Sequence, residues 1–169
     1  MGVDIHFYIT KYNKEKNIFE EIALYTAEAG KYKKVPVFIG RNYEMFDILR
    51  NKTIIDKIDF PSAPIVCNSL EEELKNTIKK YIGDKEDFTS FYSFLEVNLA
   101  DLKNYVNTCP TMVNLDYDSE EEETENNKKY KTNPVKFLYD EIINYINFAD
   151  FSFDFTPYSY YKILYFFDC

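Results

Sequence analysis

The stretch YYKILYFFDC, residues 160–169, is a nearly continuous run of aromatic and aliphatic side chains of strand length. Such a run is typical of a strand buried on both faces inside a sheet. The opening stretch MGVDIHFYIT, residues 1–10, alternates polar positions with apolar ones, namely Val3, Ile5, Phe7 and Ile9. This alternation is typical of a strand with one buried face. We therefore expect strands at both ends of the chain, lying as neighbours in one sheet.

The residues between these strands predict a hairpin and several helices. A polar turn, KYNKEKN, is followed by a second extended run, IFEEIALY at 18–25, which indicates an N-terminal hairpin. In the segment 88–106 the front half fits either a strand or a loop, and the rest is helical. From caps and apolar spacing, the four expected helices begin at Asn42, Ser69, Asn98 and Pro134. The last of them has a buried stripe of Val135, Leu138, Ile142, Tyr145 and Ile146.

The 169 residues fit one domain that buries a core of its own. We expect a single α+β domain over 1–169, with a mainly antiparallel sheet, adjacent N- and C-terminal strands, and three to four helices packed on it. Residues 116–131 contain acidic and then basic side chains without apolar periodicity. This composition predicts a mobile acidic surface loop within the domain.

Charge and composition narrow the classes of partner. The formal net charge is -9, from 29 acidic and 20 basic residues, which disfavours direct nucleic-acid binding because that needs clustered Lys and Arg. A basic protein surface is the expected partner. The N-terminus contains charged residues early and no long apolar segment, so we expect no signal peptide, no membrane association and a cytoplasmic location.

The usual motifs for cofactors, metals and nucleophiles do not occur in this sequence. The chain has one histidine and three cysteines, Cys67, Cys109 and Cys169, without C-x-x-C spacing, so no zinc site can be assembled from the usual ligands. We expect the cysteines to be reduced thiols. Walker, G-x-G-x-x-G and G-x-S-x-G motifs are all missing from the sequence. We therefore expect no cofactor and no metal.

One catalytic possibility rests on Asp4 and His6, which share a face of the first strand. If the terminal strands run antiparallel, Asp168 comes close to both. A histidine oriented by a carboxylate can act as a general base near neutral pH. The alternative is a structural polar contact that closes one face of the sheet, and both interpretations stay open from the sequence.

A ligand-binding possibility rests on Arg41, Asn42 and Tyr43, which follow Gly40 at the expected start of a helix. Backbone N–H groups point outward at a helix N-terminus, so an anion held there could also contact Arg41. The alternative is an arginine paired with an acidic residue at the surface.

A partner-binding possibility rests on an acidic run in the expected loop. Such a run can imitate a row of phosphates and occupy a basic nucleic-acid channel on another protein. The alternative is a solvated loop. The run lacks the glycine that an EF-hand loop requires, and it consists of Asp116, Asp118, Glu120, Glu121, Glu122, Glu123 and Glu125.

Three stretches together resemble a family of bacteriophage and prophage proteins of unassigned function whose members open with MGCDIH. The chain opens with MGVDIH, its stretch GRNYEMFDIL at 40–49 is similar to the family's RDYxLFxxL block, and YYKILYFFDC is similar to the family's terminal YRxVFxFDN. The family's central HSxSWL block corresponds to SFYSFL at 90–95, without the histidines, and Cys169 stands where the family has Asn. The resemblance implies a phage context and disfavours a multi-histidine metal centre in this chain.

Two functional hypotheses follow. Small acidic phage proteins without catalytic motifs commonly bind host machinery, so we expect a stoichiometric inhibitor of a host defence nuclease complex, similar to anti-CRISPR proteins. Its partner would be a host protein or ribonucleoprotein with a basic surface. The alternative is a small-ligand or nucleotide binding protein, or a hydrolase, built on Asp4, His6 and Asp168. We favour the binding protein over the enzyme.

Overall fold

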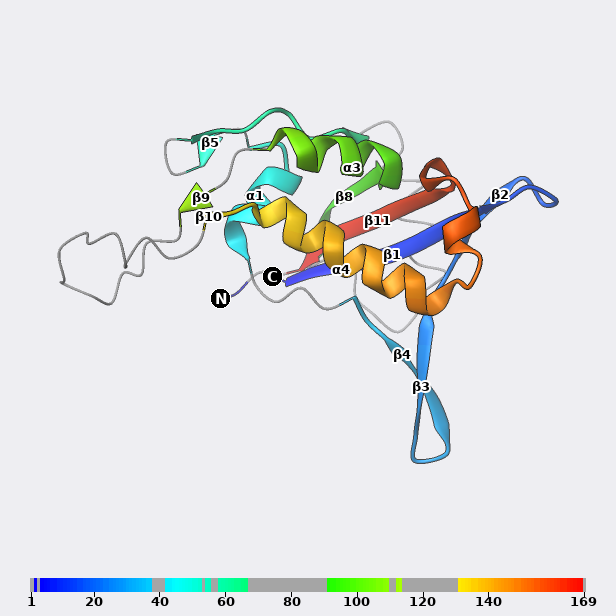
Figure 1. Cartoon of the computed structure of the whole chain (residues 1–169). Helices are drawn as coiled ribbons and strands as arrows, with labels where there is room; N and C mark the ends of the chain where they lie inside the picture. The colour runs from blue at the N-terminus through cyan, green and yellow to red at the C-terminus, as the bar shows by residue number, and fades with distance from the viewer. Residues whose placement is uncertain are drawn as a thin grey trace.

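The computed structural model describes Gly2 and residues 4–37, 42–52, 54–55, 58–66, 91–109, 112–113 and 131–168. Helices and strands alternate irregularly along this part of the chain (Figure 1). In chain order they are β1 (Asp4–Asn13), β2 (Ile18–Glu21), β3 (Leu24–Glu28), β4 (Lys31–Val35), α1 (Tyr43–Leu49), β5 (Ile54–Ile55), β6 (Ile58–Asp59), β7 (Ile65–Val66), β8 (Phe91–Asn98), α3 (Leu99–Thr108), β9 (Met112–Val113), β10 (Lys131–Thr132), α4 (Pro134–Ala149), the 3₁₀ turns η3 (Phe153–Phe155) and η4 (Tyr158–Tyr160), and β11 (Tyr161–Asp168).

The main sheet brings the two ends of the chain together. Within the described residues it has five strands in the order β2-β1-β11-β8-β7, and the pairs in it are antiparallel. β11 is the central strand, and Figure 1 shows β1 in blue beside β11 in red. The expected α+β fold with adjacent terminal strands is therefore confirmed, as is the β1–β2 hairpin.

The two faces of the sheet differ in what covers them. Ile5, Phe7 and Ile9 lie on the face that α3 and α4 cover (Figure 1), together with Ile163 and Tyr165 of β11. The opposite face carries His6, Tyr8, Leu164 and Phe166, because side chains alternate along a strand. β11 is buried on both faces, as its apolar sequence predicts: within it Tyr161, Ile163, Leu164, Tyr165, Phe166 and Phe167 are all at most 4% exposed.

Asparagine caps position the three described helices. Asn42 accepts a hydrogen bond from the Met45 N–H, Asn98 accepts one from Ala100, and Asn133 accepts two at the start of α4. Pro134 occupies the first turn of α4, and the expected buried stripe of that helix is confirmed. In the segment 88–106, whose front half was expected to be either a strand or a loop, residues 91–98 form strand β8, and helix α3 begins at Leu99. The helix expected to begin at Ser69 lies outside the described residues.

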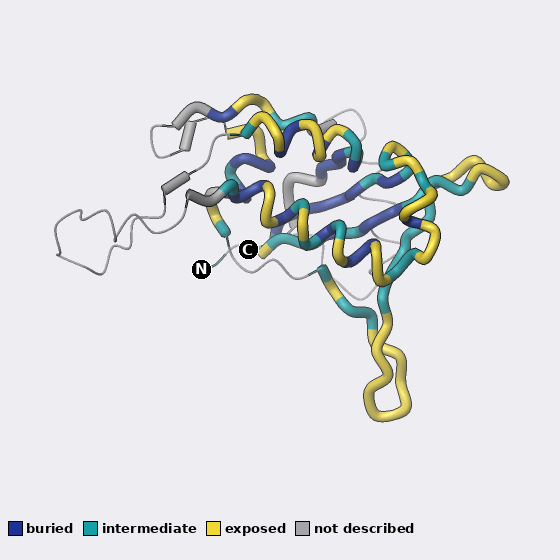
Figure 2. The backbone as a smooth tube through the Cα atoms, viewed as in Figure 1, coloured by how far each residue is buried: buried dark blue, intermediate teal, exposed yellow. Residues whose placement is uncertain are grey.

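The connection after β2 differs from the sequence prediction. The run 18–25 was expected to be one strand, but it divides at Ile22 and Ala23, and β3 leaves the sheet to pair with β4 alone. Ala29 and Gly30 join these two strands with positive φ angles of 49° and 75°, which defines a two-residue type I′ turn. The resulting two-stranded ribbon, residues 24–35, projects from the body of the molecule, and its outer part is exposed (Figure 2).

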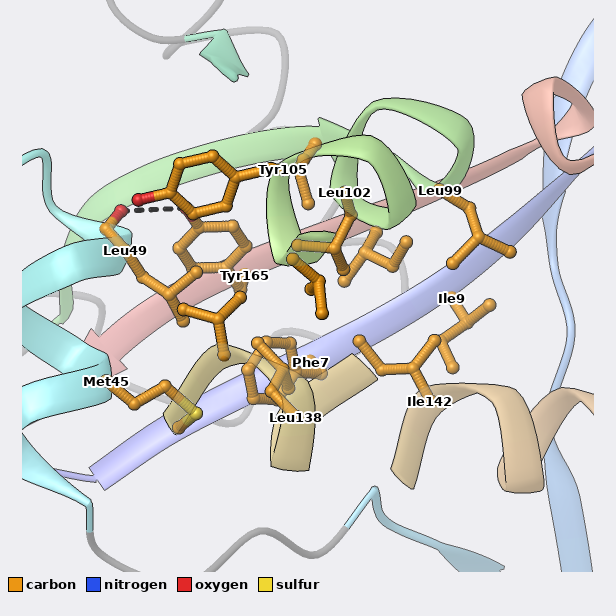
Figure 3. Packing of buried hydrophobic residues seen from close by; sticks show 14 of the residues in the cluster. Phe7, Ile9, Met45, Leu49, Leu99, Leu102, Tyr105, Leu138, Ile142 and Tyr165 are labelled. Carbon is orange, nitrogen blue, oxygen red and sulfur yellow. Dashed lines mark hydrogen bonds between the residues drawn. The ribbon is translucent and has the colours of Figure 1, made fainter. Parts of the chain in front are cut away.

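A buried hydrogen bond within the core joins α1 to the central strand, β11. Tyr165 of β11 donates its hydroxyl to the carbonyl oxygen of Leu49 at 2.8 Å, and both side chains lie within the apolar cluster (Figure 3). Leu49 ends α1, so its carbonyl has no partner within the helix. The Tyr165 hydroxyl therefore satisfies a helix-end acceptor that is buried away from water.

Replacing Tyr165 with phenylalanine tests this contact. Tyr165→Phe should lower the free energy of unfolding by about 1–3 kcal/mol, because a buried carbonyl loses its donor while the ring is kept. Denaturant unfolding measures the change. Tyr43→Phe is the matched control, since Tyr43 is 48% exposed and should leave stability unchanged. Equal midpoints for Tyr165→Phe and the wild type would show that the bond contributes nothing.

Candidate functional site

The pairing of β1 with β11 assembles a strand-end cluster of Asp4, His6 and Asp168. Asp4 lies opposite Asp168 in the register, and His6 lies opposite Phe166. The three polar side chains therefore share one face of the sheet. His6 Nε2 is 3.7 Å from Asp168 Oδ2, and the imidazole stacks on the Phe166 ring with centroids 4.9 Å apart. The expected approach of Asp168 to Asp4 and His6 is confirmed.

The chemistry of the strand-end cluster follows from these distances. A separation of 3.7 Å between Nε2 and Oδ2 exceeds the range of a hydrogen bond, so the contact is electrostatic. The His6 and Asp168 side chains are 42% and 33% exposed, and ion pairs that water reaches contribute less than about 1 kcal/mol. Stacking on the Phe166 ring helps to orient the imidazole. The general-base role stays a prediction.

The candidate ligand-binding residues lie at the start of α1. The side-chain oxygen of Asn42 accepts a hydrogen bond from the Met45 N–H at 3.0 Å and so caps the N-terminus of α1. Tyr43 is 48% exposed and packs edge-on against Phe46. Arg41 lies outside the described residues. A ligand-binding role for the three residues stays a prediction.

The acidic run Asp116–Glu125 lies outside the described residues. Of the range 116–131 that the sequence predicts to be a loop, only Lys131 is described, and it lies in β10, where it pairs with Val113. Among the described residues, no group of three or more His, Cys, Asp or Glu is arranged to hold a metal ion. In the same part of the chain, no helix has both the length and the apolar character to cross a membrane.

A second candidate surface lies at the end of α4, in a segment that the sequence analysis did not single out. Phe148, Phe151 and Phe155 are 72%, 96% and 89% exposed. We call residues 148–155 the phenylalanine segment. Between these rings, Phe153 is buried at 4% exposure and stacks on Tyr158 with centroids 5.2 Å apart. One ring thus anchors the segment while three rings face outward.

Asp150 holds the phenylalanine segment against β1 and β11. Its carboxylate accepts hydrogen bonds from Ser152 Oγ at 2.7 Å and from the Tyr161 hydroxyl at 2.8 Å, and it pairs with Lys11 Nζ at 2.7 Å. Burial alone would raise the pKa of Asp150, but the hydrogen bonds from Lys11, Ser152 and Tyr161 outweigh it and lower the pKa to about 2. The segment is therefore a fixed part of the fold.

A sequence signal for this surface existed in the helical spacing of α4. The buried stripe ends at Ile146, and Phe148 falls outside it, as do Phe151 and Phe155 beyond the helix. Three phenylalanines outside a core stripe and interleaved with aspartates indicate an outward-facing surface. By contrast, no local sequence pattern shows that Asp150 accepts these hydrogen bonds, because Lys11 and Tyr161 are distant from it or lie beyond its own segment in the chain.

Asp150→Asn should lower the free energy of unfolding at neutral pH by about 2 kcal/mol. The folded pKa of about 2 is below the ordinary value of 3.8, so the stabilisation is complete above about pH 4 and is lost as the pH falls through about 2. Denaturant unfolding between pH 7 and pH 3 should show the gap between variant and wild type narrowing below about pH 4.

The control for this prediction is Asp140→Asn, since Asp140 is half exposed and pairs with Lys136 on the surface of α4. That variant should stay close to the wild type throughout the pH range. A gap for Asp150→Asn that is the same at every pH would contradict the assigned role of the charge.

Comparisons with known proteins leave the function to be argued from this geometry. No family model matches the sequence, no curated protein matches it, and no solved structure matches it. The similarity to MGCDIH phage proteins thus stays a resemblance carried by the three quoted stretches, and no family is assigned.

Proposed function

We propose that this protein acts by stoichiometric binding to a partner protein, and that it is a phage-encoded inhibitor of a host defence nuclease complex, similar in action to anti-CRISPR proteins. The observation that carries the binding role is the phenylalanine segment. The phage context and the class of target come from the resemblance and from the acidic charge.

Three phenylalanines within eight residues stay exposed in the folded chain, so folding does not gain the free energy of burying them. Burying a phenylalanine side chain is worth about 1.5–3 kcal/mol, and Phe148, Phe151 and Phe155 realise little of this in the free chain. Single exposed apolar residues are ordinary, whereas a group of them marks an interaction surface. Contact with a partner would recover this free energy, since aromatic anchors dominate binding at interfaces.

The rigidity of the segment favours binding without rearrangement. Phe153 packs between Tyr158 and Tyr161, and Asp150 fixes the chain on the other side. The outward rings are therefore already placed before a partner arrives, which reduces the entropy lost on association.

Charge selects the kind of partner. The chain carries a net charge of -9, and Asp154 is exposed between Phe151 and Phe155. An acidic and aromatic surface is complementary to a basic one, such as the nucleic-acid channel of a nuclease. Occupying that channel would exclude the nucleic acid by competition, without chemistry on either molecule.

Titration of nuclease activity tests the stoichiometric mode. Purified protein added to a panel of host defence nuclease complexes should inhibit its target fully at about one molecule per complex, since binding consumes the inhibitor one for one. Inhibition that is complete with a small fraction of that amount and deepens with time would indicate an enzyme instead.

Paired variants connect inhibition to the surface. Phe151→Ser with Phe155→Ser should weaken inhibition at least about 100-fold, because truncated aromatic anchors each cost about 2 kcal/mol or more. Phe137→Ser is the matched control, since Phe137 is a half-exposed phenylalanine elsewhere on α4. Equal inhibition by the double variant and the control would remove the phenylalanine segment from the proposal.

The acidic run provides a second, electrostatic test. Reversing the charges of Glu120, Glu121, Glu122 and Glu123 should slow association with a basic partner, and more strongly at low salt, because exposed charges are screened over about 10 Å at 0.1 M ionic strength. Surface plasmon resonance at two salt concentrations measures this effect. Association rates that are indifferent to both the reversal and the salt would argue against the acidic run.

The alternative function is a small-ligand or nucleotide binding protein, or a hydrolase, that uses the strand-end cluster. It is supported by the meeting of His6 with Asp168 at 3.7 Å. His6→Ala separates the two proposals, because His6 is the chain's single histidine and histidine is the side chain most often used as a general base. Stoichiometric inhibition should survive this change in a folded protein, whereas a hydrolase should lose most of its rate.

A further inference from the structure

The ribbon of residues 24–35 has two open edges. Among the described residues, β3 and β4 pair only with each other, and residues 25–33 are all exposed. Backbone N–H and C=O groups therefore line the outer side of each strand, and such a row is a template for pairing with another strand. The ribbon projects from the body of the molecule (Figure 2), so a second chain can reach both edges.

Lysines protect one of these edges but not the other. Three of the five residues of β4 are lysines, namely Lys31, Lys33 and Lys34, whereas β3 has the sequence LYTAE and contains none. Lysines on an edge strand oppose pairing with a further strand. Pairing β4 with its own copy would bring three lysines from each chain onto adjacent strands, where like charges are destabilising. The outer side of β3, which we call the β3 edge, is therefore the one open to a partner.

The direction of the backbone groups on β3 follows from its contact with α4. The Tyr145 hydroxyl accepts the N–H of Leu24 at 2.9 Å and donates to the carbonyl oxygen of Val35 at 2.7 Å. Leu24 and Val35 lie opposite each other in the register, so one hydroxyl can bond both only if the Leu24 N–H points toward β4. Because backbone groups alternate in direction along a strand, Tyr25 and Ala27 point their N–H and C=O groups out of the β3 edge.

Two copies of the β3 edge are complementary to each other. In a two-fold pair, residue i contacts residue j and j contacts i. An antiparallel register centred on Thr26 places Tyr25 of each copy opposite Ala27 of the other, and Thr26 opposite Thr26. Each Tyr25–Ala27 pair can then exchange two backbone hydrogen bonds. This register uses every outward-pointing backbone group of β3.

The side chains of β3 suit the same register. Ala27 already lies opposite Tyr32 of its own chain, and it would gain Tyr25 of the second copy on its other side. A small residue is thus flanked by two rings, which leaves room for both. On the opposite face of the ribbon, Thr26 meets its own counterpart, and threonine pairs across adjacent strands are favourable.

The lysines and the bodies of the two copies stay apart in this arrangement. The β4 strand of one copy is three strand spacings, or about 14 Å, from the β4 strand of the other, whereas exposed charges are screened over about 8 Å at physiological ionic strength. Antiparallel pairing also places the two bodies at opposite ends of the joined ribbons, because each ribbon projects from its own body (Figure 1). The turn that approaches the second body consists of Ala29 and Gly30, two of the smallest residue types.

We propose that the β3 edge pairs with the β3 edge of a second copy, so that two ribbons join into one antiparallel sheet in the order β4-β3-β3-β4. The contact involves the ribbons alone, so the dimer is weak and depends on concentration, as expected for interfaces below about 1,200 Å². The phenylalanine segment lies outside this contact, so the inference goes beyond the proposed inhibition and does not rest on it.

Analytical ultracentrifugation of the full chain tests the proposal. The sedimentation coefficient should rise from that of a monomer toward that of a dimer between about 10 µM and about 1 mM, the range in which weak interfaces associate. Ala27→Pro should weaken dimerisation at least about tenfold, because proline removes an N–H that points out of the β3 edge and spares the hydrogen bonds within the ribbon. Tyr32→Pro is the matched control, since Tyr32 lies opposite Ala27 and its N–H points out of the β4 side; its dimer should persist.

Single cysteine variants test the register. The Cα atoms of a non-hydrogen-bonded antiparallel pair are about 4.5 Å apart, a distance that a disulfide can span. Thr26→Cys should therefore form a covalent dimer on mild oxidation, because Thr26 faces its own counterpart. Ala27→Cys is the matched control on the same edge, because Ala27 faces Tyr25 instead. The wild type, oxidised alongside, corrects for the three native cysteines.

Four results would overturn the inference. They are a chain that stays monomeric up to about 1 mM, equal dimerisation of Ala27→Pro and Tyr32→Pro, and equal cross-linking of Thr26→Cys and Ala27→Cys. The fourth is loss of the dimer in Phe151→Ser with Phe155→Ser, which would assign self-association to the phenylalanine segment. Failure of nuclease inhibition leaves the inference standing, because these experiments contain no partner protein.

Discussion

The pairing of β1 with β11 is the constraint on which the rest of the structure depends. It joins residues 152 positions apart, as in the hydrogen bond from Thr10 Oγ1 to the Lys162 carbonyl at 3.0 Å. Closing a loop of that length costs about 4 kcal/mol of chain entropy beyond that of a minimal loop. The apolar run of β11 offsets this cost because the strand lies at the centre of the sheet and buries side chains on both faces. Without this pairing, β2 and β8 have no common sheet.

The same pairing explains why polar groups gather at particular places. Asp4 and Asp168 meet because the strands run antiparallel in register, and Lys11 reaches Asp150 because Lys11 lies opposite Tyr161 at the other end of the pair. One end of the ladder therefore carries the strand-end cluster and the other supports the phenylalanine segment. The two candidate surfaces are separated by the length of one strand pair. The backbone pairing of β1 with β11 positions the strand-end cluster, whereas the side-chain contacts of Asp150 and Phe153 position the phenylalanine segment.

Local signals predicted the fold well where the information is local. The apolar run of β11, the asparagines before α1 and α3, and Pro134 at the start of α4 specify strand burial and helix starts within a few residues of sequence, and the structure agrees with each. The ribbon was missed because Leu24 and Tyr25 were assigned to the extended run 18–25 and no element was expected over residues 26–34. Ala29, at the first turn position with a positive φ angle, is not the Asn, Asp or Gly that signals a type I′ turn. In the strand-end cluster, the meeting of His6 and Asp168 followed from strand adjacency, whereas a distance of 3.7 Å depends on register and ring packing that no sequence pattern contains. The Asp150 contacts are long-range for the same reason.

The C-terminal half of α4 links the ribbon to the phenylalanine segment. Tyr145 bonds both strands of the ribbon, and Asp150, five positions later, bonds the chain that carries Phe151. A regular helix rises 1.5 Å per residue, so the two anchoring points are about 7.5 Å apart along a rigid element. Any partner that contacts both surfaces therefore meets them in a fixed relation, with aromatic rings on an acidic body beside lysines and tyrosines on an arm. The separation of the two surfaces is therefore set by one helix and not by a flexible connection.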